Sequence, residues 1–181
     1  MTLKEIIKLH NAMGKDLIID GICYYMREGK VHVKGLEDTI SHIKVLEGTE
    51  VITDRAFEDH ICLKTIEVPK SVYRIGGCAF HGCTSLINVK LPDTLSCIEY
   101  GVFDYCKSLV HIEIPCSIKF IDSRAFYDCT SLQQIFIPPN VVTIRDMAFY
   151  YCNSLRRVKL PKRFKYQLGN IFNIDARFEL Y

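Results

Sequence analysis

The chain repeats itself every 23 residues. Phenylalanine stands at positions 57, 80, 103, 126 and 149, and proline stands at positions 69, 92, 115, 138 and 161. A fixed period of this length indicates stacked repeats, because so short a unit cannot bury its own apolar side and must pack against the next unit. The period therefore predicts a solenoid of five 23-residue coils.

Each coil carries the pattern Leu-x-x-Φ-x-Φ-Pro, in which Φ is Val, Ile or Leu. The pattern occurs at residues 63–69, 86–92, 109–115, 132–138 and 155–161. Alternating apolar positions are typical of a short strand with one buried face. Proline ends the strand because it has no amide hydrogen to donate to a ladder. We expect one such strand per coil, stacked about 4.8 Å from the next.

A second pair of apolar residues follows the proline of each coil. The pairs are Val72 with Ile75, Leu95 with Ile98, Ile118 with Ile121, and Val141 with Ile144. A small residue and phenylalanine come next, as in Ala79-Phe80 and Ala125-Phe126. The same phase in successive coils predicts apolar ladders that run along the stack.

The full motif, Ala-Phe-x-x-Cys-x-Ser-Leu-x-x-Val/Ile-x-Ile/Leu-Pro-x-x-Val/Ile-x-x-Ile, closely resembles the BspA-like, or treponemal-type, leucine-rich repeats. Residues 79–98 and 125–144 are near-consensus examples, and the resemblance covers about residues 52–161, with a weaker extension back to Ile40, Ile43 and Val45. It implies an α/β-type repeat fold that is mostly β, a right-handed leucine-rich-repeat solenoid with a parallel sheet on its concave face. It also implies binding or adhesion rather than catalysis.

An open solenoid exposes its core at both ends unless caps cover them. Thr2 and Glu5 fit a helix capping box. Residues 21–35 alternate on both sides of Glu28-Gly29 and predict a β-hairpin. Beyond Pro161, we expect a helical segment with Phe164, Leu168 and Phe172, and then an edge strand with Phe178 and Leu180. The expected division is an N-terminal cap at 1–39, repeats at 40–161 and a C-terminal cap at 162–181, all in one structural domain.

The net charge of +2 does not call for a polyanionic partner. Lys4, Glu5 and Lys8 interrupt the apolar run that an export signal needs, and no stretch reaches the roughly 18 apolar residues of a membrane span. We therefore expect a cytoplasmic protein, a monomer or weak oligomer, with the cell surface or secretion by a non-classical route as the alternative. Many members of the resembling family carry export signals, and this chain departs from them.

Four of the nine cysteines recur at one phase, namely Cys83, Cys106, Cys129 and Cys152, and His60 holds that position in the first coil. Parallel Cβ vectors in a ladder disfavour disulfides, and a straight row cannot supply four tetrahedral zinc ligands. Buried structural thiols are expected. Oxidation in isolated protein and metal binding are the alternatives. Cys78, Cys97 and Cys116 lie off this row and are expected to be partly exposed.

The sequence gives no positive support for an enzyme. Its six histidines form no His-Glu-x-x-His arrangement, and neither a P-loop nor a Gly-x-Gly-x-x-Gly motif occurs. A cysteine nucleophile needs a positioned base, and no Cys/His signature is present. We expect no catalytic residues, no metal and no cofactor.

Residues that flank the buried strand positions should face the open concave side because strand side chains alternate. We predict that a protein or peptide partner binds these positions, with Ile87, Val110 and Phe136 as an apolar patch in a polar surround. The predicted contact residues are Ile87, Asn88, Lys90, Val110, His111, Glu113, Gln133, Gln134, Phe136, Arg156, Arg157 and Lys159. Scattered surface residues without a function are the alternative.

Two other functions remain open. A surface or secreted adhesin follows from the family resemblance alone. The basic run from Arg156 to Lys165 suggests nucleic-acid binding, although strand alternation sends its side chains to different faces. The leading expectation is a cytoplasmic protein-interaction scaffold.

Overall fold

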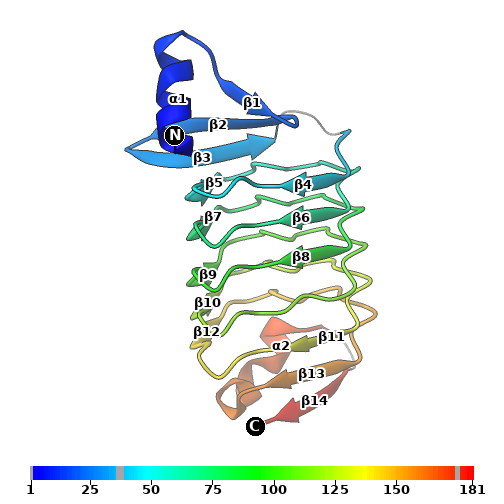
Figure 1. Ribbon diagram of the computed structural model, residues 1–181. Coiled ribbons are helices and arrows are strands. Elements are labelled where there is room, and N and C mark those ends of the chain that lie inside the picture. The colour runs from blue at the N-terminus through cyan, green and yellow to red at the C-terminus, as the bar shows by residue number, and fades with distance from the viewer. Residues whose placement is uncertain (1, 36–38, 174–175) are drawn as a thin grey trace.

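The computed structural model describes residues 2–35, 39–173 and 176–181. It shows an elongated stack of coils with an N-terminal cap at one end and a short C-terminal cap at the other (Figure 1). Residues 36–38, which the expected N-terminal cap includes, lie outside the described residues, as does Met1. The predicted solenoid with parallel sheets is confirmed.

The Leu-x-x-Φ-x-Φ segments form the strands along one side of the stack. These are β4 (His42–Lys44), β6 (Thr65–Glu67), β8 (Asn88–Lys90), β11 (Gln134–Phe136) and β13 (Arg157–Leu160). Neighbouring strands are parallel and one period apart, so that Ile43 pairs with Ile66 and Ile66 with Val89. The weak extension of the repeat to Ile43 is therefore a true coil.

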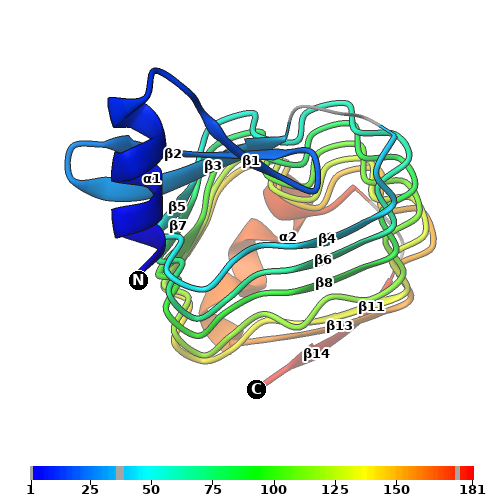
Figure 2. The same cartoon turned by 45° about the horizontal axis from the view of Figure 1, so that its top comes forward.

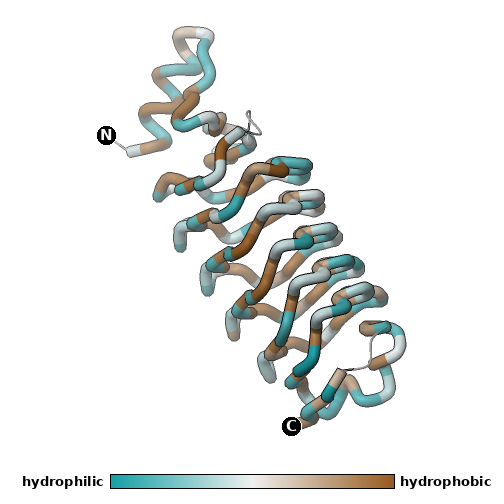
Figure 3. The backbone as a smooth tube through the Cα atoms, turned by 90° about the vertical axis from the view of Figure 1, so that its right-hand side faces the viewer, coloured by the Kyte–Doolittle hydropathy of each residue, from teal (hydrophilic) through white to brown (hydrophobic). Residues whose placement is uncertain are grey.

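The second apolar pairs form very short strands on another side of the stack (Figure 2). They are β5 (Val51–Ile52), β7 (Arg74–Ile75), β9 (Cys97–Ile98), β10 (Phe120–Ile121) and β12 (Thr143–Ile144). Ile75, Ile98, Ile121 and Ile144 all point into the core. The two strand-bearing sides thus share one apolar interior, and hydrophobic segments recur from coil to coil (Figure 3).

The N-terminal cap forms as its sequence predicts. Helix α1 (Leu3–Ala12) begins with the capping box of Thr2 and Glu5 and buries Ile7. Strands β2 (Ile22–Arg27) and β3 (Lys30–Gly35) make the hairpin, and β1 (Leu17–Ile19) pairs with β2. Strand β3 pairs in parallel with β5, which closes this end of the stack by continuing its sheet.

One expected strand is missing. Residues 110–113, in the coil of Phe103, keep the burial pattern, with Ile112 and the following Ile114 in the core, but they do not form a strand. The ladder is interrupted here, which leaves two separate sheets, β4-β6-β8 and β11-β13-β14. Side-chain packing maintains this coil because burial of Ile112 and Ile114 does not depend on the ladder hydrogen bonds.

The phenylalanine column is longer than the expected five coils. Successive rings from Phe57 to Phe149 stack with centroids 5.0 to 5.5 Å apart, and Phe172 stacks on Phe149 at 5.1 Å. Phe172 was expected on a helix with Phe164 and Leu168. It instead follows the short helices η1 (Lys162–Gln167) and α2 (Leu168–Ile171) in extended backbone, because it occupies the next position of the 23-residue period.

The final strand completes this sixth coil. Strand β14 (Arg177–Leu180) pairs in parallel with β13, and Phe178 faces Val158 across the ladder. The predicted edge strand with Phe178 and Leu180 is confirmed. The C-terminal segment therefore both caps the stack and extends its strand-bearing side by one strand.

Two positions in the corner of each coil have left-handed backbone. At both positions φ lies between 55° and 71°. The first position is held by Arg55, Cys78, Gly101, Arg124 and Met147, and the second by Asp59, Gly82, Tyr105, Asp128 and Tyr151. This conformation costs about 1–2 kcal/mol for residues with a Cβ. The tight corner is therefore imposed by coil stacking rather than by local preference.

Candidate functional site

The candidate site lies on the strand face, which we define as the solvent-exposed side of β4, β6, β8, residues 111–113, β11, β13 and β14. All the predicted contact residues are exposed, and four of them, Ile87, Val110, Gln133 and Arg156, each lie one residue before the strand face. On the strand face itself, buried residues separate the other eight. Alternation along each strand produces this result. Whether they bind a partner stays a prediction.

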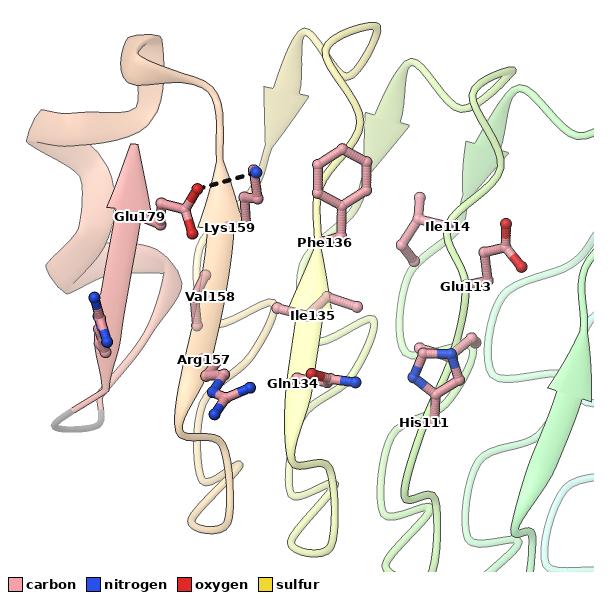
Figure 4. A pocket seen from close by; sticks show the side chains of 12 residues that line it. His111, Glu113, Ile114, Gln134, Ile135, Phe136, Arg157, Val158, Lys159 and Glu179 are labelled. Carbon is pink, nitrogen blue, oxygen red and sulfur yellow. Dashed lines mark ion pairs between the residues drawn. The ribbon is translucent and has the colours of Figure 1, made fainter. Parts of the chain in front are cut away.

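A pocket of about 490 Å³ opens on the C-terminal half of the strand face (Figure 4). Ile112, Ile135 and Val158 contribute its apolar floor, and the pocket lies beside the interruption of the sheet. The predicted contact residues that line it are His111, Glu113, Gln134, Phe136, Arg157 and Lys159. Arg177 and Glu179 also line it, and our sequence analysis missed them because it treated β14 as a cap rather than a coil.

The other predicted contact residues lie around this pocket. Neither this pocket nor the second pocket described below is lined by Ile87, Asn88, Lys90 or Val110. Phe136 occupies the strand position of Glu113, which is three residues after Val110. Since three residues of extended chain span about 10 Å, the structure does not bring Ile87, Val110 and Phe136 into one compact patch.

Phe136 forms an aromatic wall with Tyr181. Their rings stack at a centroid distance of 5.7 Å and an interplanar angle of 18°, and the Phe136 side chain remains 46% exposed. The Tyr181 hydroxyl donates a hydrogen bond of 2.6 Å to the carbonyl of Ile137. The Lys159 ammonium lies 5.7 Å from the Tyr181 ring centre. The last residue of the chain thus shapes the site, which no motif signalled.

The charged residues of the pocket are only partly neutralised. Lys159 pairs with Glu179 at 3.0 Å. Arg157 and Arg177 face each other across the β13–β14 ladder. Neither forms an ion pair with a carboxylate within residues 2–35, 39–173 and 176–181. Two exposed arginines on paired strands therefore lie at one edge of the pocket.

A second, polar pocket of about 490 Å³ shares Gln134 and Arg157 with the first. Gln133, Gln134, Ser154, Arg156 and Arg157 line it, and no carboxylate does. The Arg156 guanidinium donates to the carbonyl of Asn153 at 2.7 Å, which holds it in place. Amide, hydroxyl and guanidinium donors without an acid favour an anionic group.

The thiol row is structural, as predicted. Cys83, Cys106, Cys129 and Cys152 are buried, and each Sγ donates to a phenylalanine carbonyl of the preceding coil at 3.0 to 3.2 Å. Burial raises the pKa of Cys83 and of Cys152 to about 12. Such thiols stay protonated and unreactive near neutral pH.

Three cysteines off this row are free thiols and more accessible. Cys78 and Cys97 are half-buried and Cys116 is exposed, as expected. Burial raises the pKa of Cys97 to about 11. No His/Cys/Asp/Glu group suited to a metal ion occurs in the part of the chain that the structure describes.

One charged cluster escaped the sequence analysis. The Asp104 side chain is 3% exposed, and its Oδ2 lies 3.0 Å from the Arg124 guanidinium and 3.5 Å from Nδ1 of His81. Burial raises the pKa of the Asp104 carboxyl, although Arg124 and His81 partly counteract this. The Arg124 guanidinium also lies over the Tyr127 ring at 3.8 Å. This cluster fixes the corners of adjacent coils.

Solved structures of bacterial leucine-rich repeat proteins resemble this fold. A protein of Bacteroides ovatus is 30% identical with a TM-score of 0.75, over 80% of this chain and 41% of the other. A leucine rich cell surface protein of Faecalibacterium prausnitzii is 27% identical with a TM-score of 0.74, over 88% and 42%. The chain thus spans about two fifths of these proteins. A T. pallidum leucine-rich repeat protein is 26% identical with a TM-score of 0.73, over 91% and 84%.

The family of the chain follows from its match to a family model. A search of curated proteins gives no match. Within the described residues, no helix is both long enough and apolar enough to cross a bilayer. The family model for the BspA type leucine rich repeat region matches residues 50–176 with six copies, in agreement with the sixth coil of the structure. The chain belongs to the BspA type leucine-rich repeat family.

Proposed function

We propose that this protein is a non-enzymatic interaction module that holds an extended segment of a partner protein on its strand face. The observation that supports this most directly is the exposed aromatic wall of Phe136 and Tyr181 beside the pocket. Aromatic and arginine side chains are enriched at protein interfaces. The wall sits on a close-packed stack, so little entropy is lost in ordering it on binding.

A displayed library of short random peptides tests this proposal. Peptides selected on the native protein should lose binding to the double variant Phe136→Ser, Arg157→Ser. The matched control is Lys119→Ser, Phe120→Ser, which removes an exposed cation and an exposed aromatic residue at the start of β10, on the other strand-bearing side. Selected peptides that bind the first variant as well as the control would place binding elsewhere and refute the proposal.

A second candidate is an interaction role on the cell exterior. It is favoured by the Faecalibacterium relative, which is described as a cell surface protein. Protease treatment of intact cells distinguishes a protein in the cytoplasm from one on the cell exterior. Loss of the protein under treatment that spares a cytoplasmic marker would support the exterior, and its survival would support the cytoplasm.

A further inference from the structure

Two exposed rows run across the strand face in the region of the pocket. The arginine row contains His111, Gln134, Arg157 and Arg177, and the phenylalanine row contains Glu113, Phe136, Lys159 and Glu179. Figure 4 shows their labelled members on either side of the buried floor. The rows are two residues apart on each strand, which corresponds to about 6.6 Å.

The two rows differ in how their charges are balanced. In the phenylalanine row, Lys159 is neutralised by Glu179 at 3.0 Å. In the arginine row, Arg157 and Arg177 lie on paired strands with no carboxylate partner among the described residues. Like charges one strand apart repel each other. A carboxylate bound between them would remove this repulsion and accept charge-assisted hydrogen bonds from both.

The phenylalanine row offers a different contact. Phe136 is half-exposed, and its ring stacks on that of Tyr181. The buried Ile114 lines the same pocket. An aromatic or large aliphatic side chain placed here would cover the exposed ring surface. The pocket thus presents one anion-binding edge and one apolar edge.

The spacing of these edges matches an extended peptide that lies along β13, because Arg157 is on β13 and the stacked rings of Phe136 and Tyr181 come from the segments on either side of it. Residues i and i+2 of such a peptide point to the same side and stand about 6.6 Å apart. A peptide that crosses the strands would meet contacts about 4.8 Å apart while rising about 3.3 Å per residue, so its side chains would fall out of phase.

We propose that the pocket binds an extended peptide segment in which Asp or Glu stands two residues from an aromatic or large aliphatic residue. The carboxylate lies between Arg157 and Arg177, and the apolar side chain packs on the stacked rings of Phe136 and Tyr181. This inference rests on the proposed function and specifies its partner. Nucleic acid fits less well, because Glu113 in the neighbouring row has no ion-pair partner among the described residues and would repel a chain of phosphates.

Three capped peptides test the inference by NMR on the full-length ¹⁵N-labelled protein. The probe is Gly-Ser-Glu-Thr-Phe-Ser-Gly. One control replaces Glu with Gln, and the other exchanges Thr and Phe so that Glu and Phe are adjacent and point to opposite sides. The probe should shift amides of β11, β13 and β14 and bind about tenfold more tightly than either control, as expected for one charge-assisted hydrogen-bonded pair.

A charge-matched pair of variants assigns the preference to residues. Arg157→Gln, Arg177→Gln should bring the affinity ratio of the Glu and Gln peptides to about one. Lys162→Gln, Lys165→Gln removes the same charge from exposed positions of the C-terminal cap and should leave that ratio unchanged. Equal thermal midpoints would show that both variants fold, and Arg157→Lys, Arg177→Lys should retain part of the preference.

The outcomes separate this inference from the proposed function. If the three peptides bind the strand face equally, the acidic requirement is wrong and the interaction module stands. If none of them shifts strand-face amides, the inference is wrong, and the library selection decides the proposed function independently. If oligothymidine binds this face and displaces the probe, the site recognises nucleic acid and the inference is overturned.

Discussion

The buried columns and the exposed rows of this protein follow opposite rules within the same coils. Phe57, Phe80 and Phe103 repeat without change and stack ring on ring. At one exposed strand position, by contrast, successive coils carry Asn88, His111, Gln134 and Arg157. Core positions are constrained by packing against identical neighbours, whereas exposed positions are not. In such a chain, repetition indicates structure, and loss of repetition indicates where to look for function.

The largest effect should come from breaking the phenylalanine column. Phe103→Ala removes a fully buried ring that stacks on rings on both sides, and it should reduce the free energy of unfolding by about 3–5 kcal/mol. Gln134→Ala, at an exposed position, should change it by about 0.5 kcal/mol or less. Urea denaturation measures both. Similar losses for the two variants would contradict the division between columns and rows.

An intermediate effect is expected at the left-handed corner, where the backbone repeats but the residue type does not. Gly101→Ala places a Cβ in backbone with φ of 59° and should cost about 1–2 kcal/mol. Met147→Gly, at the equivalent position with φ of 62°, should stabilise the protein by up to about 1 kcal/mol, because relief of strain exceeds the added entropy of the unfolded chain.

Thermal denaturation of these two corner variants measures the difference. Effects of the same sign for both substitutions would show that the local backbone conformation does not govern stability at this corner.

The smallest effect concerns Asp104, a polar residue that the repeat buries. Because burial raises the pKa of its carboxyl, the folded protein retains the Asp104 proton to higher pH than the unfolded chain. The protonated Asp104 carboxyl therefore contributes stability that is fully present below its ordinary pKa of about 3.9. This contribution is lost as pH rises through the higher pKa of the folded state.

Asp104→Asn should remove this pH dependence, since the side chain can no longer ionise. The measurement is the difference in unfolding free energy between the native protein and the variant across this pH range. The native protein should lose stability relative to the variant as pH rises. A relative gain would mean that the ion pair with Arg124 outweighs the cost of burying the charge.

Much of the fold was predictable because its signals are periodic. The 23-residue step predicted the coils, the thiol row and the exposed positions, while Thr2 and Glu5 predicted the cap of α1. Phe172 also stands at this step, so the period alone could have revealed the sixth coil. The neighbouring Phe164 and Leu168 suggested a helical spacing instead.

Periodicity alone determined which side chains are buried and which are exposed, because every coil meets the same neighbours. Only the tertiary structure decided that the ladder breaks at residues 110–113, that Arg177 pairs with Arg157, and that Tyr181 stacks on Phe136. The last two of these features depend on how the last coil, which does not keep the full period, docks on the stack. That docking is set by contacts between segments far apart in the chain, which a local pattern does not encode.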